Sequence, residues 1–188
     1  SVKEKLGKKG TPLFIPIGAE DKLKGVIDLM QMKALFFDDP KGKVKAGDIP
    51  AELADEAKKY REAMTEDIAE CDEALMDKYL ESGELTPEEL KAGLRKGVVS
   101  GSLFPVACGV ANRNIGISPL MALIAAAMPS PLDREDARGK NPSTGADEQR
   151  NPDEKAPFSA YVFKTISDPF AGRLTLFRVY SGTASSDG

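Results

Sequence analysis

The clearest pattern in the sequence is PAELADEAKKYREAMTEDIAECDEALMDKYLES, which occupies residues 50–82. This run contains no glycine, and no proline after its first residue. Its apolar residues recur at spacings of three and four, so at about 100° per residue they fall on one face. The pattern predicts one long amphipathic helix, which Gly83 ends. The apolar positions are Leu53, Ala57, Tyr60, Met64, Ile68, Cys71, Ala74, Leu75 and Tyr79.

The opposite face of this predicted helix is strongly acidic. Residues 51–82 hold eleven acids and four bases, which gives −7, and because the whole chain carries −4 the remainder carries +3. Such a ridge is either a solvated helix face or a docking surface for a basic partner. Like charges four residues apart destabilise a helix, and this cost favours the docking surface over a merely solvated face. The candidate partner-binding residues are Asp55, Glu62, Glu66, Glu70, Glu73 and Asp77.

A second helix is predicted immediately after the first. The residues Thr86-Pro87-Glu88-Glu89 form a capping box with proline at the first helical position, which is a strong start signal. We expect this helix to run to about Val98, with Leu90, Leu94 and Val98 facing inward.

Strand patterns flank the two helices. Residues 11–17 and 103–107 are short apolar runs that predict strands, and residues 25–37 predict one bent strand or a tight pair. Residues 38–47 read as a loop with a brief strand near 43–45. The Ala-rich run 117–128 predicts a mostly buried helix. Together these patterns indicate an α/β protein.

The last third of the chain has a different composition. Residues 133–155 contain no large apolar residue, so we expect a linker or mobile loop there. Residues 156–166 and 173–180 predict two antiparallel strands joined by a turn. Since two strands alone are barely stable in water, we expect the rest of their sheet beyond residue 188. Both chain ends therefore read as cut, and residues 1–10 resemble the end of a helix.

Composition excludes several classes of site. The chain has no histidine, which removes histidine-based triads and metal sites. Its two cysteines, Cys71 and Cys108, are expected to be free thiols. The net charge of −4 gives no general attraction to nucleic acid or to an acidic membrane. The longest apolar stretch, 115–128, is too short and too interrupted to span a bilayer.

Several segments, in order, resemble the translational GTPase family of elongation factor G. The first are PIGAE (16–20), GVIDL (25–29) and MKA (32–34), followed by DIPA (48–51) and LMDKYL (75–80). The others are PSPLD (129–133), DPFAGRLT (168–175) and FRVYSG (177–182), of which the last two are the most specific.

The resemblance implies an α/β fold: the C-terminal part of a P-loop GTPase domain with an α+β insertion subdomain, followed by the first strands of a β-barrel. It assigns 1–10 to a core helix end, 11–101 to the insertion, 102–128 to the last core strand and helix, 129–155 to a linker and 156–188 to the barrel. The parent would be a cytoplasmic elongation factor of protein biosynthesis that promotes tRNA and mRNA translocation or ribosome recycling. Alternatives are a divergent, catalytically weak ribosome-binding paralogue and a ribosome-protection protein.

The resemblance also places part of a nucleotide site in this chain. The full-length protein would bind GTP or GDP with Mg²⁺, and Gly109, Val110 and Ala111 match its guanine-contacting loop. Val110 stands where the family has serine, and Asn112 also departs from the pattern, so we expect altered guanine discrimination. The phosphate-loop signature is absent, and D-x-x-G matches at 39–42 and 136–139 read as chance. The chain alone should be inactive, with no catalytic or metal-binding residue.

The partner implied by the resemblance is the ribosome, with no membrane and no DNA. The acidic helix would meet the ribosomal stalk protein, and the barrel, through Lys164, Arg173 and Arg178, would lean on small-subunit rRNA. Its aromatic residues are expected to form barrel core rather than stack on bases.

Overall fold

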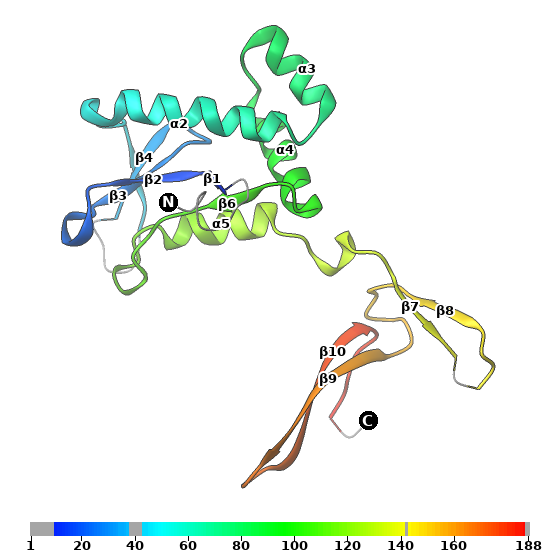
Figure 1. Cartoon of the computed structure of the whole chain (residues 1–188). Helices are drawn as coiled ribbons and strands as arrows, with labels where there is room; N and C mark the ends of the chain where they lie inside the picture. The colour runs from blue at the N-terminus through cyan, green and yellow to red at the C-terminus, as the bar shows by residue number, and fades with distance from the viewer. Residues whose placement is uncertain (1–9, 38–42, 142, 187–188) are drawn as a thin grey trace. The chain divides into compact units, whose positions relative to one another are not determined.

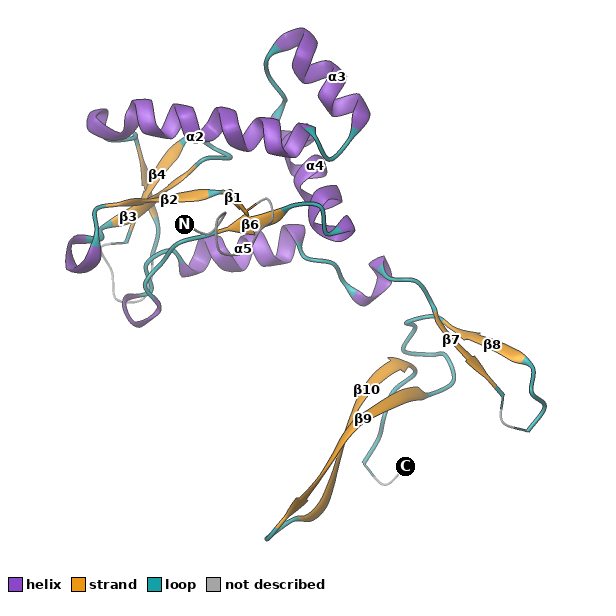
Figure 2. Cartoon of the chain, in the orientation of Figure 1, coloured by secondary structure: helices purple, strands orange, loops and turns teal. Residues whose placement is uncertain are grey.

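A computed structural model describes residues 10–37, 43–141 and 143–186, which divide after Met128 into two compact units (Figure 1). The first unit mixes helices and strands, and the described part of the second is mainly strands (Figure 2). The chain is therefore a mixed α/β protein, as predicted. The D-x-x-G match at 39–42 lies outside the described residues, as do residues 1–9 of the predicted helix end.

The first unit contains a parallel strand pair that joins distant parts of the sequence. Strand β1 (Gly10–Pro12) pairs in parallel with β6 (Phe104–Val106). The Leu13 N–H then donates to the Val106 carbonyl at 2.9 Å, after which the chain leaves β6. The predicted strand 11–17 is consequently two strands with different neighbours. Its first residues pair with β6. The family resemblance assigns 11–101 to the insertion and 102–128 to the GTPase core, and so places these two strands in different subdomains.

The chain segment between β1 and β6 begins with a four-stranded antiparallel sheet. Its order is β2 (Phe14–Ile17), β3 (Gly25–Asp28), β4 (Lys33–Phe36) and β5 (Lys45–Gly47), with the short helix η1 (Glu20–Lys22) between the first two. The tight-pair alternative for 25–37 is thus correct, and the brief strand lies slightly later than expected. Strand β3 is buried along its whole length, which places it at the centre of the core.

The buried Asp28 and the half-buried Arg61 of the first α-helix both form hydrogen bonds with the backbone of the β3–β4 turn. The Asp28 carboxylate accepts from the N–H groups of Met30 and Gln31, at 2.8 and 3.0 Å, and so shapes the β3–β4 turn. The Arg61 guanidinium donates to the carbonyls of Leu29 and Met30 at 2.7 and 2.9 Å. Burial raises the pKa of Asp28, and Arg61 partly offsets this. The turn and the helix are therefore fixed to each other by hydrogen bonds as well as by packing.

The prediction of a single long helix is wrong. The run forms α2 (Ala51–Ala69) and α3 (Glu73–Ser82), separated by a break at residues 70–72. Asp72 is the cause, because its side chain accepts from the N–H groups of Ala74 and Leu75 and starts a new helix. Gly83 ends α3 in the left-handed conformation, as predicted. The apolar spacing continues through the break, so periodicity alone gave no sign of it.

Helix α4 (Pro87–Ser100) confirms the predicted capping box at Thr86 and Glu89. Leu90 and Leu94 are buried, and Val98 packs against the core from a half-buried position. Two glycines let α4 approach its neighbours closely. A Cβ on Gly93 would lie 2.7 Å from the side chains of Ile68 and Leu75, and one on Gly97 would lie 2.6 Å from Cys71 Sγ. The helix is thus seated at the corner between α2 and α3.

Helix α5 (Ile117–Ala127) follows β6 and lies on the other side of the strands from α2 (Figure 1). Its inner side meets α4, where Arg95 Nη1 donates to the Ala126 carbonyl at 3.2 Å. The prediction that this helix is mostly buried is wrong, because Met121 is 60% exposed and Ala127 is its only buried residue among those described. One apolar face of α5 is therefore open.

The second unit starts with structure where a linker was predicted. The helix η3 (Pro131–Asp133) is followed by the hairpin β7 (Ala137–Lys140) and β8 (Asp147–Arg150). Asn141 holds the hairpin, because its side-chain oxygen accepts from the N–H groups of Ser143 and Thr144 and its amide donates to Glu148. Turn chemistry thus forms a hairpin where no apolar core is available. The second D-x-x-G match, 136–139, lies at the start of this hairpin.

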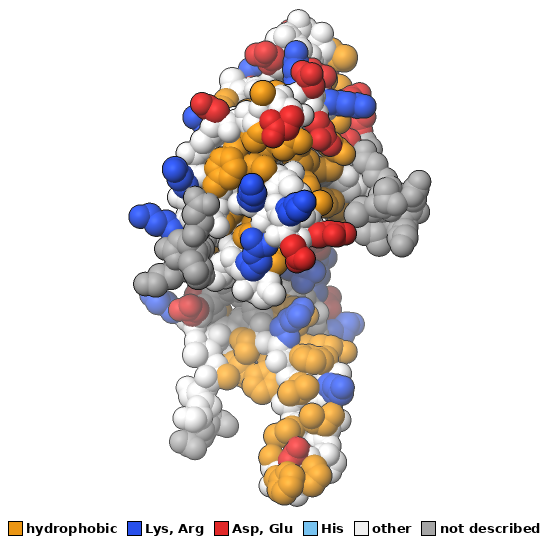
Figure 3. Space-filling model, turned by 90° about the vertical axis from the view of Figure 1, so that its left-hand side faces the viewer, with side chains coloured by type: hydrophobic (Ala, Val, Ile, Leu, Met, Phe, Trp, Pro, Cys, Tyr) orange, Lys and Arg blue, Asp and Glu red, His pale blue; other side chains and the backbone are white. Residues whose placement is uncertain are grey.

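The predicted C-terminal strand pair is confirmed as β9 (Ser159–Asp168) and β10 (Gly172–Ser181), which are antiparallel. The Asp168 carboxylate accepts from the N–H groups of Phe170 and Ala171 and shapes the turn. Hydrophobic side chains cover much of this hairpin (Figure 3). The aromatic residues predicted to fill a barrel core are all exposed: Phe158, Tyr161, Phe163, Phe170, Phe177 and Tyr180. The described part of the second unit therefore contains two hairpins, each its own two-stranded sheet.

The structure also bears on membrane-spanning segments and on the state of the two cysteines. No helix in the described part of the chain is long and apolar enough to cross a membrane. Cys71 and Cys108 are both free thiols, as predicted.

Candidate functional site

The predicted guanine loop connects β6 to α5. Val110 and Ile115 exchange two backbone hydrogen bonds of 2.9 and 3.1 Å, which close a small ring. Inside the ring, the short helix η2 (Ala111–Arg113) is followed by Asn114 in the left-handed conformation. Outside it, the Arg113 guanidinium donates to the Asp21 carbonyl at 3.2 Å. The loop is therefore held both by its own backbone and by η1, the short helix between β2 and β3.

Two glycines are required for this ring to close. A Cβ on Gly109 would lie 2.6 Å from the Ile115 carbonyl oxygen, and one on Gly116 would lie 2.6 Å from that of Cys108. Gly116 also has a φ of 76°, which other residues adopt at a cost. The close approach of the two backbone segments therefore requires glycine at 109 and at 116.

The three predicted loop residues have different environments. Val110 packs against the core, and its N–H is already bonded within the ring. Ala111 is exposed, and its N–H donates to no described residue. Gly109 and Ala111 border a cavity of about 400 Å³ whose other wall is the apolar face of α5, with Leu120, Leu123 and Ile124. The structure thus brings two of the three predicted residues to one cavity and turns the third into the core.

Cys108 lines the same cavity, although sequence reasoning gave it no role there. Its thiol lies 3.6 Å from the Phe14 carbonyl, toward which it donates. Burial raises the pKa of Cys108, so the residue stays a thiol at neutral pH rather than a reactive thiolate. Neither Cys108 nor Arg113 could be linked to Phe14 or Asp21 from the sequence, because more than 90 residues separate each pair.

The six acidic candidates are all exposed, but they do not form one helical ridge. Asp55, Glu62 and Glu66 lie on α2, Glu70 caps its C-terminus, and Glu73 and Asp77 lie on α3. The last three border a hollow of about 440 Å³ together with Asp72 and Met76. The break after α2 therefore divides the predicted ridge into a helix face and an acidic hollow at the α2–α3 corner.

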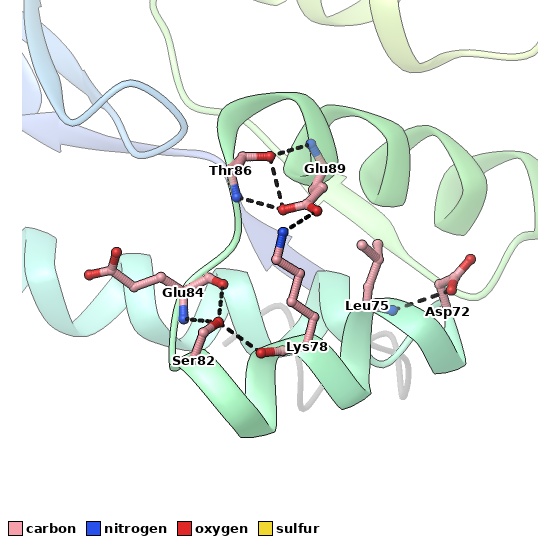
Figure 4. Close-up of polar contacts among 7 residues, drawn as sticks. All are labelled: Asp72, Leu75, Lys78, Ser82, Glu84, Thr86 and Glu89. Carbon is pink, nitrogen blue, oxygen red and sulfur yellow. Dashed lines mark hydrogen bonds and ion pairs between the residues drawn. The ribbon is translucent and has the colours of Figure 1, made fainter.

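The polar contacts behind this hollow fix α3 onto α4 (Figure 4). Lys96 on α4 pairs with the Asp72 carboxylate and, through that bond, lowers the pKa of Asp72. Lys78 pairs with Glu89, and this contact together with Thr86 lowers the pKa of Glu89 to about 2. Asp72 and Glu89 therefore serve to hold α3 against α4. Asp72 and Met76 are the members that periodicity missed.

The described residues contain no group of three or more acidic or cysteine side chains placed to hold a metal ion.

Comparison with known proteins places the chain by its fold. No family model matches the sequence. The chain is similar to the crystal structure of ttk003000868 from Thermus thermophilus, with 32% sequence identity and a TM-score of 0.72. The match covers 96% of this chain and 24% of the other, so the chain spans about a quarter of that protein's length. The mixed α/β arrangement is thus shared with a known protein.

Proposed function

We propose that this chain is part of a cytoplasmic, ribosome-dependent translational GTPase similar to elongation factor G, in which it carries one edge of the guanine site and a docking surface for the ribosomal stalk. Translocation and recycling are both activities of this class. The proposal combines the sequence resemblance with two features of the first unit, the loop after β6 and the acidic corner of α2 and α3.

The observation that carries the proposal is the position of the loop. It leaves the carboxyl end of β6, a strand in a parallel pair, and leads into α5. Ligands of open α/β sheets bind outside the carboxyl ends of the strands, where turns offer backbone donors. The N–H of Ala111, which donates to no residue in the described part of the chain and belongs to a residue that borders a cavity, is a donor of this kind.

The residues present fit one edge of a guanine nucleotide. The Ala111 N–H suits the guanine carbonyl oxygen, and the apolar wall of α5 suits a flat ring. No phosphate-loop signature exists in the sequence to hold the phosphates. In the intact protein the nucleotide would supply the phosphoanhydride that is hydrolysed with Mg²⁺, while this chain's residues position the base. Alone, the chain should bind GTP too weakly to measure.

The acidic residues support the second part of the proposal. Exposed carboxylates on α2 and around the hollow give this side of the unit an excess of negative charge, which speeds the docking of a basic partner. The second unit, which we propose to be the start of a β-barrel, would add a contact with rRNA through Lys164, Arg173 and Arg178. No membrane and no DNA partner is proposed.

Co-sedimentation of the chain with ribosomes tests the docking surface. We expect binding that weakens with salt and that depends on the stalk protein. The double variant Glu62→Lys and Glu66→Lys should reduce the bound fraction severalfold, because both side chains are exposed on α2. Glu56→Lys with Glu81→Lys makes the same charge change outside the candidate set and should bind as the original chain does. Equal losses for the two double variants would contradict a defined docking surface.

The divergent, catalytically weak paralogue is a second candidate, and Val110 favours it. Valine has no hydroxyl with which to brace the loop, and the side chain of Val110 packs against the core instead. In the intact GTPase that we propose, Val110→Ser should tighten GDP binding if bracing is what the loop lacks. Equal GDP affinities of the two proteins would remove this candidate.

A further inference from the structure

The second unit contains a large cavity, and one of its lining residues, Arg178, is among the three basic residues proposed above to contact rRNA. Its volume is about 710 Å³, and its lining comes from four separate segments: the region of η3, strand β7, the end of β8 and the end of β10. Three arginines from three of these segments line it, namely Arg134, Arg150 and Arg178. A ligand there would touch residues that are distant in sequence but close in the folded unit.

The charges around the cavity favour an anion. Arg150 pairs with the Glu148 carboxylate, whereas Arg134 and Arg178 have no acidic partner in the described part of the chain. Glu135 is the one acid among the lining residues, against three guanidinium groups. Two arginines therefore keep unused donor sets, and the planar fork of a guanidinium matches the oxygens of a phosphate.

The remaining lining is apolar and aromatic. Arg178 and Tyr180 both line the cavity from the end of β10, where an irregularity in the pairing with β9 leaves Tyr180 unpaired. Tyr180 is 41% exposed, which leaves part of its ring accessible, and Pro131 and Pro152 add flat apolar surface. Aromatic rings of this kind bind nucleic-acid bases by stacking, with little dependence on sequence.

We propose that this cavity binds a nucleoside phosphate, with the phosphate held by Arg134 and Arg178 and the base stacked on Tyr180. The volume is within the range of small-molecule sites. Arg150, already paired, forms the third wall. The ligand is either a free nucleotide or a nucleotide of single-stranded RNA, because both present the same phosphate and base.

This inference does not rest on the proposed function. The cavity lies wholly within the second unit and shares no residue with the guanine loop or the acidic residues. Its test uses an adenine nucleotide and no ribosome. If the test fails, the proposed guanine loop and stalk-docking surface are unaffected. If the GTPase proposal fails, nucleotide binding by this cavity can still be tested in the same way.

The experiment measures binding of AMP to the full 188-residue chain by calorimetry and binding of a labelled oligoadenylate by fluorescence anisotropy. Arg178→Ala should weaken both about tenfold, the usual cost of losing one charge-assisted hydrogen bond. Tyr180→Leu should weaken AMP severalfold and leave inorganic phosphate unchanged, whereas Tyr180→Phe should bind AMP normally. Glu135→Gln should bind more tightly, because it removes the one lining carboxylate.

Arg138→Ala is the matched control, since it removes the same charge from an exposed position of the same unit, on β7, outside the cavity. Circular dichroism checks folding, and Arg134→Ala, on an exposed residue after η3, replaces Arg178→Ala if that variant does not fold. AMP binding with the expected variant pattern supports the proposal with a free nucleotide as ligand, and binding of the oligonucleotide alone supports it with RNA. Equal losses in Arg138→Ala and Arg178→Ala, or no saturable binding of either probe, would overturn it.

Discussion

Leu90 on α4 and Leu176 on β10 are the same residue type in the two units, yet Leu90 is 0% exposed and Leu176 is 39% exposed. The contrast extends to whole units. Every buried apolar side chain in the described residues lies between Leu13 and Ala127, and the one buried residue of the second unit is Ser181. The first unit is thus stabilised by hydrophobic burial, and the second depends on other contacts.

Those other contacts are hydrogen bonds that tie the base of the β9–β10 hairpin to the preceding segment. The buried Ser181 hydroxyl donates to the Pro157 carbonyl at 2.7 Å and lies 2.8 Å from the Ser159 hydroxyl. The Gly182 N–H donates to the Asp153 carbonyl at 2.9 Å. Each such bond contributes only about 1 kcal/mol, so the second unit should be the less stable of the two.

Truncating the two leucines should give the largest difference between the units. Leu90→Ala leaves a cavity in a closed core and should cost about 2–5 kcal/mol of unfolding free energy, because the site cannot collapse fully. Leu176→Ala on the exposed hairpin should cost less than about 1 kcal/mol. Urea unfolding followed by NMR signals from each unit measures both values. Equal costs would mean that β10 is covered in solution, as a barrel would require.

Adding a methyl group at one glycine of each unit tests the same difference in packing. An added methyl normally stabilises a helix, but at Gly97 it would lie 2.6 Å from Cys71 Sγ and 2.9 Å from Leu103 Cβ. Gly97→Ala should therefore destabilise the first unit by about 1–3 kcal/mol through overpacking.

Gly139→Ala in the second unit is the matched control. A Cβ there meets nothing within 4 Å, so the substitution should change stability by less than about 0.5 kcal/mol. Both variants are compared with the original chain in the same urea experiment. A stabilised Gly97→Ala would show that α4 can move away from the corner of α2 and α3.

The same contrast separates what the sequence could predict from what it could not. Local signals were sufficient for the capping box at Thr86, the end of α3 at Gly83 and the β9–β10 hairpin, because each depends on residues a few positions apart. The break at Asp72 was missed because the apolar spacing runs through it and because Lys96, its partner, lies on another helix. The β7–β8 hairpin was missed because it has no apolar residues to count and is held by Asn141.

The candidate site divides in the same way. The resemblance placed Gly109 and Ala111 in the loop, and both border a cavity. The inward position of Val110 and the anchoring of the loop by Arg113 depend on contacts with Ile115 and Asp21, which no sequence spacing reveals. The open face of α5 was missed for the opposite reason, because an apolar sequence predicts burial without showing what covers it.

The smallest expected effect is a difference in pH dependence between one acid of each unit. Burial raises the pKa of Asp28, so its contribution to stability is present at low pH and is lost as the pH rises through the folded value. Hydrogen bonds from the Ala171 and Phe170 N–H groups lower the pKa of Asp168. Its contribution is therefore present above the ordinary value and is lost as the pH falls through the folded value.

Asparagine at each position removes the titration while keeping an acceptor oxygen for the same N–H groups. Between about pH 4 and about pH 7, Asp28→Asn should gain stability relative to the original chain as the pH rises, because the original must then ionise a buried carboxyl. Asp168→Asn should lose stability relative to the original chain as the pH rises toward about 4, because the lowered pKa of Asp168 places its ionisation below that pH. Urea unfolding at several pH values, followed by NMR signals from each unit, measures both slopes. Slopes of the same sign would mean that Asp28 is hydrated in solution. The hydrogen bonds from Arg61 to the carbonyls of the β3–β4 turn would then have to be broken.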